Sequence, residues 1–201
     1  MARVSARRTI ENALRRYGFV RVAGVDEVGR GCLAGPVMAG AVILDPERRI
    51  DGLADSKLLT AAHRELLHEE ITGKAIAWAV VSVTPDEIDR INIHQATLQA
   101  MRRAVLALAP LPDAVLVDAF RIPSLPMAQR GVIGGDRRSS VIAAASIVAK
   151  VTRDRMMRAL HASDPRYGFD RHKGYATADH LAAVARFGYS PLHRRSCRPA
   201  T

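Results

Sequence analysis

Acidic residues occur in this sequence at three places where a charge needs an explanation. Asp26 and Glu27 stand at the end of an apolar segment and enter the glycine-rich turn 26–31. Asp118 ends a second apolar run, and Asp136 lies in a Gly-Gly-Asp turn just before the longest helical pattern. A carboxylate at the end of a buried strand must be ion-paired, hydrogen-bonded or bound to a metal ion. These four residues are therefore the first candidates for a functional site.

Several converging carboxylates are typical of metal-ion catalysis on phosphate esters. Mg²⁺ and Mn²⁺ prefer oxygen ligands, and two such ions can stabilise the attacking and the leaving oxygen of an in-line displacement. Adjacent residues of a regular strand point to opposite faces, so Asp26 and Glu27 can share one site only if the strand ends or bends there. The alternative is that they cap a turn and that Asp136 caps the next helix; spacing alone fits both interpretations.

The turn after the acidic pair has the composition of a ligand-binding loop. Gly29 and Gly31 let the backbone approach a ligand closely, and Arg30 can meet a phosphate with a planar fork of donors. Most Gly-Arg-Gly sequences are simple turns, and that alternative stays open here. The position of this one directly after Asp26 and Glu27 favours a binding role.

An α/β architecture is needed to position these residues. Hydrophobic patterns predict strands over 19–26, 37–44, 74–83 and 114–118. Helices are predicted over 60–71, from Thr84 onward, and over 93–109, 140–161 and 178–187. Ile10, Ala13, Leu14 and Tyr17 recur at helical spacing and predict a surface helix near the N-terminus, and the alanines of 143–149 would let the longest helix lie close to the sheet. No repeat or linker appears, so we expect one domain over 1–201.

The composition limits the kinds of partner and the cellular compartment that we expect for this protein. Thirty Lys and Arg against 20 Asp and Glu give a net charge of +10, which favours a nucleic-acid partner. The alternative is a high-GC genome, which gives Arg- and Ala-rich proteins whatever their function. Two cysteines, Cys32 and Cys197, exclude a disulfide scaffold and a four-cysteine zinc module. The longest apolar stretch, 31–44, is too short to span a membrane, and no signal-peptide core is present. We therefore expect a cytoplasmic protein without a membrane partner.

Long blocks of the chain resemble the type 2 ribonuclease H family, in particular its bacterial ribonuclease HII members. The first block, AGVDEVGRGCLAGPVMAGAVIL, spans 23–44. The likeness continues in the family's order and spacing through DSKLL (55–59), NIHQATLQAMRRAV (92–105), VLVDAF (115–120), GGDRRSSVIAAASIVAKVTRDRMM (134–157) and DRHKGYATADHLAAVARFGYSPLHRRS (170–196).

This resemblance implies a fold and an activity. The fold would be ribonuclease H-like, with a mixed five-stranded sheet flanked by helices and a C-terminal helical extension over about 160–201. The implied enzyme is a metal-dependent endoribonuclease that hydrolyses the RNA strand of RNA–DNA hybrids and cuts at ribonucleotides embedded in duplex DNA. Two-metal-ion in-line attack of water would leave 3′-hydroxyl and 5′-phosphate ends. The alternatives are a DNA-only nuclease of the same fold and a non-catalytic nucleic-acid binding module.

The resemblance also implies roles for single residues. Asp26, Glu27, Asp118 and Asp136 would be both the catalytic residues and the ligands of Mn²⁺ or Mg²⁺. Gly29, Arg30 and Gly31 would read the ribose 2′-hydroxyl, and Tyr175 would stack near the sugar of the next nucleotide. Lys57 would bind the substrate backbone, unless it is an ordinary surface lysine. We expect a monomer whose partner is an RNA–DNA hybrid or ribonucleotide-containing duplex DNA.

Some positions depart from the family pattern or carry weaker predictions. Ala119 and Phe120 stand where glycine and a polar residue are common, Gly135 where lysine is frequent, and Cys197 where phenylalanine is often found. Lys150 and Asp154 have the spacing of a helical ion pair. A basic set could line a nucleic-acid groove, with some members simply solvated: Arg137, Arg138, His172, Lys173, His193, Arg194 and Arg195.

Overall fold

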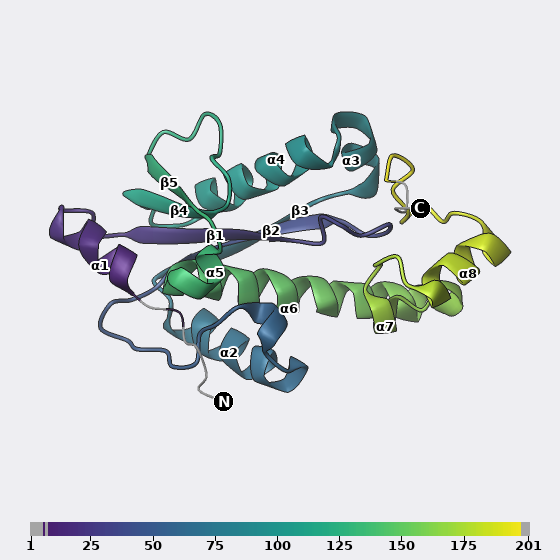
Figure 1. Cartoon of the computed structure of the whole chain (residues 1–201), viewed down its shortest axis with the longest axis horizontal. Helices are drawn as coiled ribbons and strands as arrows, with labels where there is room; N and C mark the ends of the chain where they lie inside the picture. The colour runs from purple at the N-terminus through teal and green to yellow at the C-terminus, as the bar shows by residue number, and fades with distance from the viewer. Residues whose placement is uncertain (1–5, 7, 198–201) are drawn as a thin grey trace.

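The structure is a computed structural model that describes residue 6 and residues 8–197. Its centre is a five-stranded sheet in the order β3-β2-β1-β4-β5 (Figure 1). The strands are β1 (Val22–Val28), β2 (Val37–Ile43), β3 (Ala77–Val83), β4 (Ala114–Asp118) and β5 (Ala128–Val132). β1 pairs antiparallel with β2, and β2 antiparallel with β3, whereas β1–β4 and β4–β5 are parallel. The mixed five-stranded sheet is therefore confirmed.

Helices cover both faces of this sheet. The described helices are α1 (Thr9–Arg16), α2 (Ala61–Lys74), α3 (Pro85–Ile91), α4 (Ile93–Leu106), α5 (Gly135–Arg138), α6 (Ser140–Ser163), α7 (Phe169–His172) and α8 (Ala178–Phe187), with short 3₁₀ turns at Ser56–Leu58 and Pro165–Tyr167. In Figure 1, α4 lies on one side of the sheet and the long α6 on the other, with α2 packed outside α6. The two faces give two separate apolar clusters, one around Met101 of α4 and one around Ile147 of α6.

The predicted elements are present, with shifts at their ends. Thr84, Asn92 and Thr177 accept hydrogen bonds from the amides of Glu87, Gln95 and His180, as helix caps do, and the predicted starts at these residues are confirmed. The N-terminal helix is confirmed as α1, whereas its upstream residues 1–5 and 7 lie outside the described part, as do 198–201 of the C-terminal region. The third strand was expected from 74, but α2 continues to Lys74 and β3 begins at Ala77.

The first strand corrects the expectation that the strand ends or bends at the acidic pair. It does not end at Asp26 but runs on to Val28, with Asp26 opposite Gly40 and Glu27 opposite Ala39 of β2. The parallel partner β4 stops earlier, since its last pairing with β1 joins Val117 to Val25. The end of β1 therefore projects past β4, and this open side, rather than a bend, gives the acidic pair access to one cleft.

α6 lies unusually close to the sheet. A Cβ added to Gly24 of β1 would come within 2.1 Å of the carbonyl carbon of Val141, and one added to Gly40 of β2 within 2.6 Å of the carbonyl oxygen of Ala145. The alanines 143–145 and 149 of this helix are fully buried, which confirms the predicted close packing. Within the described residues, no helix combines the length and the apolar character that crossing a membrane requires.

Candidate active site

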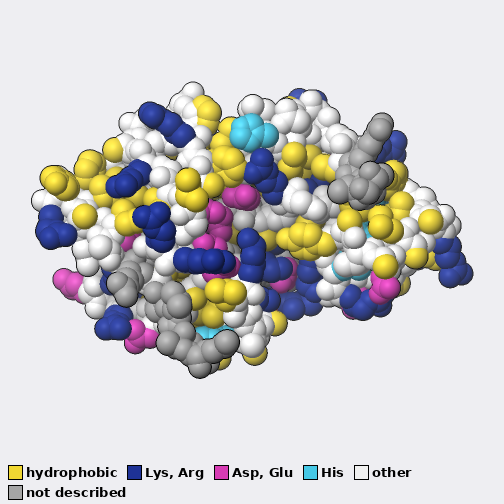
Figure 2. Space-filling model, viewed as in Figure 1, with side chains coloured by type: hydrophobic (Ala, Val, Ile, Leu, Met, Phe, Trp, Pro, Cys, Tyr) yellow, Lys and Arg dark blue, Asp and Glu magenta, His cyan; other side chains and the backbone are white. Residues whose placement is uncertain are grey.

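A cleft of about 190 Å³ opens where β1 projects past β4. Its lining comes from β1, the turn after it, the 3₁₀ turn at 56–58, α6 and the loop before α8: Asp26, Glu27, Val28, Gly29, Arg30, Gly31, Ser56, Lys57, Ser146, Lys150 and Tyr175. Figure 2 shows acidic side chains gathered near the middle of this face, bordered by Lys and Arg side chains. The cleft thus combines the two acidic residues of β1 with all the residues predicted to bind substrate.

Asp26 lies at the bottom of the acidic group and is only 8% exposed. Burial, followed by the nearby charges of Glu27 and Asp118, raises the pKa of Asp26 well above its ordinary range. One carboxylate oxygen accepts a hydrogen bond of 2.8 Å from the backbone N–H of Glu27. Ser146, which shares a 2.7 Å hydrogen bond with Ser56, lies beside the Asp26 side chain and acts to lower its pKa. The side chain is therefore held firmly, and its negative charge is costly without a cation.

Glu27 shares this electrostatic environment. Burial and the charge of Asp118 raise the pKa of Glu27. Its Oε2 atom is buried and has no hydrogen-bond partner among the described residues. Buried carboxylate oxygens are normally paired, so an unpaired one beside two further carboxylates is suited to a cation.

Asp118 comes to the site at the end of β4. Its Oδ1 accepts a 2.8 Å hydrogen bond from the N–H of Gly135. A Cβ at Gly135 would lie 2.5 Å from Cδ1 of Ile142 and 3.1 Å from Asp118 Oδ1, so the glycine permits this close contact. Ala119 has a φ of 55°, a left-handed conformation that glycine adopts more easily, which gives a physical reason why glycine is common at this family position.

Asp136 lies on α5, and the structure adds a fifth carboxylate beside it. Burial, then the charges of Asp55 and Asp118, raises the pKa of Asp136. Asp55 is 4% exposed; burial acts to raise its pKa, but the Lys57 amide and the Arg137 guanidinium together hold it below the usual range. Arg137 pairs with Asp55 at 3.2 Å. Sequence reasoning did not single out Asp55, whose only signal was its place at the start of the DSKLL block.

The donor set fits divalent cations. Within the described part of the chain, no group of three or more His, Cys, Asp or Glu side chains already has the arrangement of a complete metal site. The residues nevertheless supply what Mg²⁺ or Mn²⁺ requires: oxygen ligands, mutual repulsion among Asp26, Glu27 and Asp118, and a buried, unpaired Glu27 oxygen.

Two buried arginines hold the glycine-rich turn and the residues that follow it. Arg153 of α6 is fully buried and donates to the carbonyl oxygens of Ala34, Pro36 and Lys173 at 2.9–3.1 Å. Arg194 is 1% exposed and donates to the carbonyls of Gly35 and Arg30 at 2.8 and 3.1 Å. These bonds connect the turn after β1 to the segment around Lys173 and to the C-terminal segment. Arg194 thus fixes the backbone at Arg30, and Arg153 fixes the segment just after the turn predicted to bind substrate.

The residues predicted to line a basic groove have different environments in the structure. Arg194 and His193 are buried and cannot line a groove, which corrects that prediction for both residues. The reason is tertiary: His193 accepts a hydrogen bond from the N–H of Ser190, and Arg194 donates to the carbonyl of Gly35 in the segment after β1. Arg137 pairs with Asp55, whereas Arg138 and Arg195 are exposed. His172 and Lys173 are half-buried in the loop before Tyr175.

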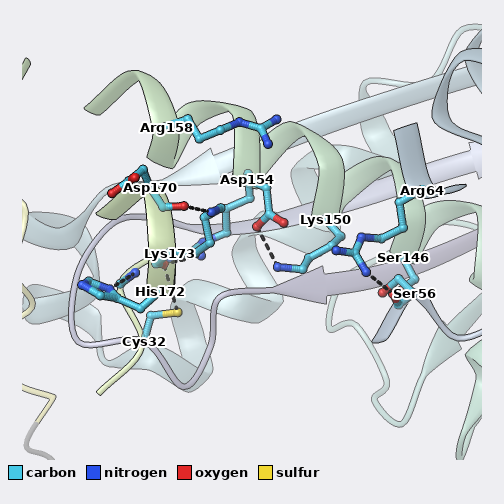
Figure 3. Close-up of polar contacts among 12 residues, drawn as sticks. Cys32, Ser56, Arg64, Ser146, Lys150, Asp154, Arg158, Asp170, His172 and Lys173 are labelled. Carbon is cyan, nitrogen blue, oxygen red and sulfur yellow. Dashed lines mark hydrogen bonds and ion pairs between the residues drawn. The ribbon is translucent and has the colours of Figure 1, made fainter. Parts of the chain in front are cut away.

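Lysines and a tyrosine form the rim of the cleft. Lys57 is exposed, and Tyr175 is 40% exposed. Lys150 pairs with Asp154 at 2.7 Å, which confirms the predicted helical ion pair, and Figure 3 shows it on α6 between Asp154 and the Ser56–Ser146 pair. Arg30 places its guanidinium over the Phe120 ring at 4.9 Å. The cleft therefore offers cations and a ring face around an acidic centre.

A buried histidine next to this region makes the stability of the protein dependent on pH. Burial, and then the neighbouring His180, lowers the pKa of His193 from 6.5 to about 4. The unfolded chain therefore binds more protons than the folded chain between about pH 6.5 and 4, and the free energy of unfolding falls as the pH falls through that window. We expect His193 to contribute a loss of at most about 3 kcal/mol.

Urea unfolding of the wild type and of His193→Gln at pH 7, 6, 5 and 4, with chelator present, measures this contribution. The wild type should lose more stability than the variant between pH 6.5 and 4. The carboxyls with raised pKa values, such as Asp26, act in the opposite direction but are present in both proteins and cancel in the comparison. Parallel pH profiles for the two proteins would contradict the assignment.

The sheet topology and the acidic cleft together define a metal-dependent nuclease with the ribonuclease H-like fold. Solved structures with this fold include ribonuclease H2 from Pyrococcus horikoshii, with a TM-score of 0.73 and 28% identity over 88% of this chain and 93% of that one. They also include ribonuclease HII from Archaeoglobus fulgidus, solved in complex with PCNA, with a TM-score of 0.75 and 25% identity over 90% of this chain and 97% of that one. Ribonuclease HII of Ralstonia nicotianae is 55% identical over 181 residues, 89% of this chain and 77% of its own. Residues 23–199 match the Ribonuclease HII family. The chain belongs to the ribonuclease HII family.

Membership of this family settles the class of reaction. The family cleaves RNA in RNA–DNA hybrids and at ribonucleotides embedded in duplex DNA, and it depends on divalent metal ions. The protein is therefore an enzyme, a hydrolase of phosphodiester bonds. The two alternatives, a non-catalytic binding module and a DNA-only nuclease, are excluded.

Proposed function

We propose that Asp26, Glu27, Asp118 and Asp136 are the catalytic carboxylates and hold two divalent ions, Mn²⁺ or Mg²⁺. The observation that carries this proposal is the grouping of carboxylates from β1, β4 and α5: Asp26 and Glu27 line the cleft, and Asp118 is bonded to Gly135, the residue before Asp136. Burial and repulsion, with the charge of Asp118 among the causes each time, raise the pKa values of Asp26, Glu27 and Asp136. Bound ions of this kind supply Lewis acidity and an activated water for in-line attack at phosphorus. The products are a 3′-hydroxyl and a 5′-phosphate.

The protein's own groups bind and orient the substrate. Gly29, Arg30 and Gly31 read the ribose 2′-hydroxyl through a backbone that Arg153 and Arg194 hold in place, and Lys57 contacts a phosphate from the rim. Tyr175, which lines the same cleft, stacks near the sugar of the following nucleotide. The 2′-hydroxyl is the group that distinguishes RNA from DNA at one position, so these residues select the cutting site. The enzyme acts as a cytoplasmic monomer.

Cleavage of three labelled duplexes tests this proposal: all DNA, DNA with one ribonucleotide, and a continuous RNA–DNA hybrid. Each is incubated with Mg²⁺, with Mn²⁺ and with chelator, and the ends of the products are analysed. We expect metal-dependent cutting on the 5′ side of the lone ribonucleotide and within the hybrid, with intact all-DNA duplex. Cutting of the hybrid alone would contradict the roles of Tyr175 and Gly29–Gly31, and cutting in chelator would contradict the role of the carboxylates.

A further inference from the structure

A chain of hydrogen bonds inside the C-terminal region ends at the backbone of Tyr175. Tyr175 follows Lys173 and Gly174, whose φ values of 52° and 88° are both left-handed. Its carbonyl oxygen lies 2.9 Å from Nδ1 of His180, which is fully buried in the first turn of α8. The Tyr175 side chain faces the cleft, so the position of this carbonyl bears directly on the substrate side of the loop.

The partners of the histidines define where each proton lies. The N–H of Ser190 can only donate, and it lies 3.0 Å from Nδ1 of His193. That nitrogen is therefore the acceptor, and the proton of neutral His193 is on Nε2. His193 Nε2 lies 3.0 Å from His180 Nε2, which must then accept. The proton of His180 is left on Nδ1, where it donates to the Tyr175 carbonyl.

A third histidine fixes the residues just before Tyr175 in the same way. Nδ1 of His172 accepts from the N–H of Gly174 at 3.2 Å, and its Nε2 lies 2.7 Å from the Tyr167 carbonyl (Figure 3 shows His172 beside Lys173 in this loop). The His172 ring stacks on His180, with ring centroids 4.4 Å apart and an interplanar angle of 14°. Burial lowers the pKa values of His172, His180 and His193, in keeping with three neutral rings.

The far end of the chain joins both substrate-contacting loops. His193 pairs with Ala34 in an isolated β-bridge, and the next residue, Arg194, donates to the carbonyl of Arg30 in the glycine-rich turn. The two consecutive residues therefore connect to two parts of the cleft lining: Arg194 to Arg30, and His193 through His180 to Tyr175. This connection sets the distance between the glycine-rich turn, which reads the 2′-hydroxyl, and the ring of Tyr175.

We propose that His180 is a positioning residue for substrate recognition, which places Tyr175 through an oriented relay from Ser190 through His193 to the Tyr175 carbonyl. This inference rests on the proposed contact between Tyr175 and the substrate. His180 itself touches no substrate: it is fully buried and acts through the backbone of the loop. A lone embedded ribonucleotide offers the fewest other contacts, so its recognition depends most on this placement.

Two substitutions of His180 separate the two halves of the relay. His180→Asn keeps a donor near the Nδ1 position for the Tyr175 carbonyl, whereas His180→Gln keeps an acceptor near Nε2 for His193 and loses the bond to Tyr175. For duplex DNA with one ribonucleotide, we expect His180→Gln to raise KM by about tenfold, as Tyr175→Ala does, and His180→Asn to stay within about threefold of the wild type. The kcat on the continuous hybrid should change less than twofold in His180→Gln and His180→Asn.

The outcomes distinguish this inference from the proposed role of Tyr175. If Tyr175→Ala leaves KM unchanged, the contact between Tyr175 and the substrate is wrong. If Tyr175→Ala raises KM but His180→Gln and His180→Asn behave alike, the relay is wrong and the contact stands. Imidazole nitrogen NMR of the wild type tests the relay without any variant: it should report the Nδ1–H tautomer for His180 and the Nε2–H tautomer for His193. Any other pair of tautomers would overturn the proposal.

Discussion

Asp26→Asn is expected to abolish turnover while leaving the metal-free protein at least as stable as the wild type. The loss should be about 10³-fold or more in kcat, because one central oxygen ligand and its charge disappear from the site. The expected effect on the stability of the metal-free protein is in the opposite direction to the effect on turnover. In the absence of metal, burial and the charges of Glu27 and Asp118 oppose ionisation of Asp26. An amide of the same shape removes that repulsion and still accepts the hydrogen bond from the Glu27 N–H.

Thermal unfolding with chelator and then with Mn²⁺, beside single-turnover cleavage, measures both effects. The wild-type Tm should rise with Mn²⁺, because an ion that binds only the folded state stabilises it, and the variant should lose most of that rise. Asp86→Asn is the matched control: it makes the same chemical change at an exposed position on α3, and it should leave cleavage and the Mn²⁺ response intact. An Asp26→Asn protein that still cuts, or that melts well below the wild type in chelator, would contradict the site.

The candidate site was predictable from the sequence where its signal is local. Asp118 and Asp26 are acidic residues at the end of apolar runs, a pattern that requires an explanation whatever the fold. The helix starts at Thr84, Asn92 and Thr177 were equally accessible, because a cap and its amide partner lie three residues apart. The fifth strand was not: Ala128–Val132 is a mostly exposed edge strand whose residues show no strand pattern, and only the family resemblance implied it.

Other features depend on tertiary contacts that no local pattern encodes. Arg194 was predicted to line a groove and nothing in the sequence singled out Arg153, but both are buried and donate to carbonyl oxygens from distant parts of the chain. Asp55 becomes part of the acidic group only because Arg137 and Asp136 fold against it. The histidine relay joins residues 175, 180, 190 and 193 through ring nitrogens whose protonation follows from their partners. Sequence reasoning therefore found the charged centre and missed the groups that hold its surroundings.

Gly24→Ala is expected to cost about 3 kcal/mol or more of folding free energy, because no small adjustment can accommodate the added methyl group. Its Cβ would lie 2.1 Å from the carbonyl carbon of Val141, 2.2 Å from the carbonyl oxygen, and 2.4 Å from the nitrogen of Ile142. These are backbone atoms of α6, so the helix itself would have to move. β1 is the central strand, paired on both sides at this point with Val42 and Leu116, and cannot move instead.

The same substitution should also reduce turnover in the molecules that remain folded. Gly24 and Asp26 are two residues apart on β1 and share a face, so a helix displaced at Gly24 also shifts Ser146, which lies beside Asp26. Urea unfolding and kcat should therefore change together in Gly24→Ala. Gly40→Ala, which meets the Ala145 carbonyl at 2.6 Å, should act in the same direction, whereas Gly73→Ala, in open space on α2, should be neutral or stabilising by up to about 1 kcal/mol. A Gly24→Ala protein as stable as Gly73→Ala would show that α6 does not approach β1 this closely, and the placement of Ser146 against Asp26 would have to be abandoned with it.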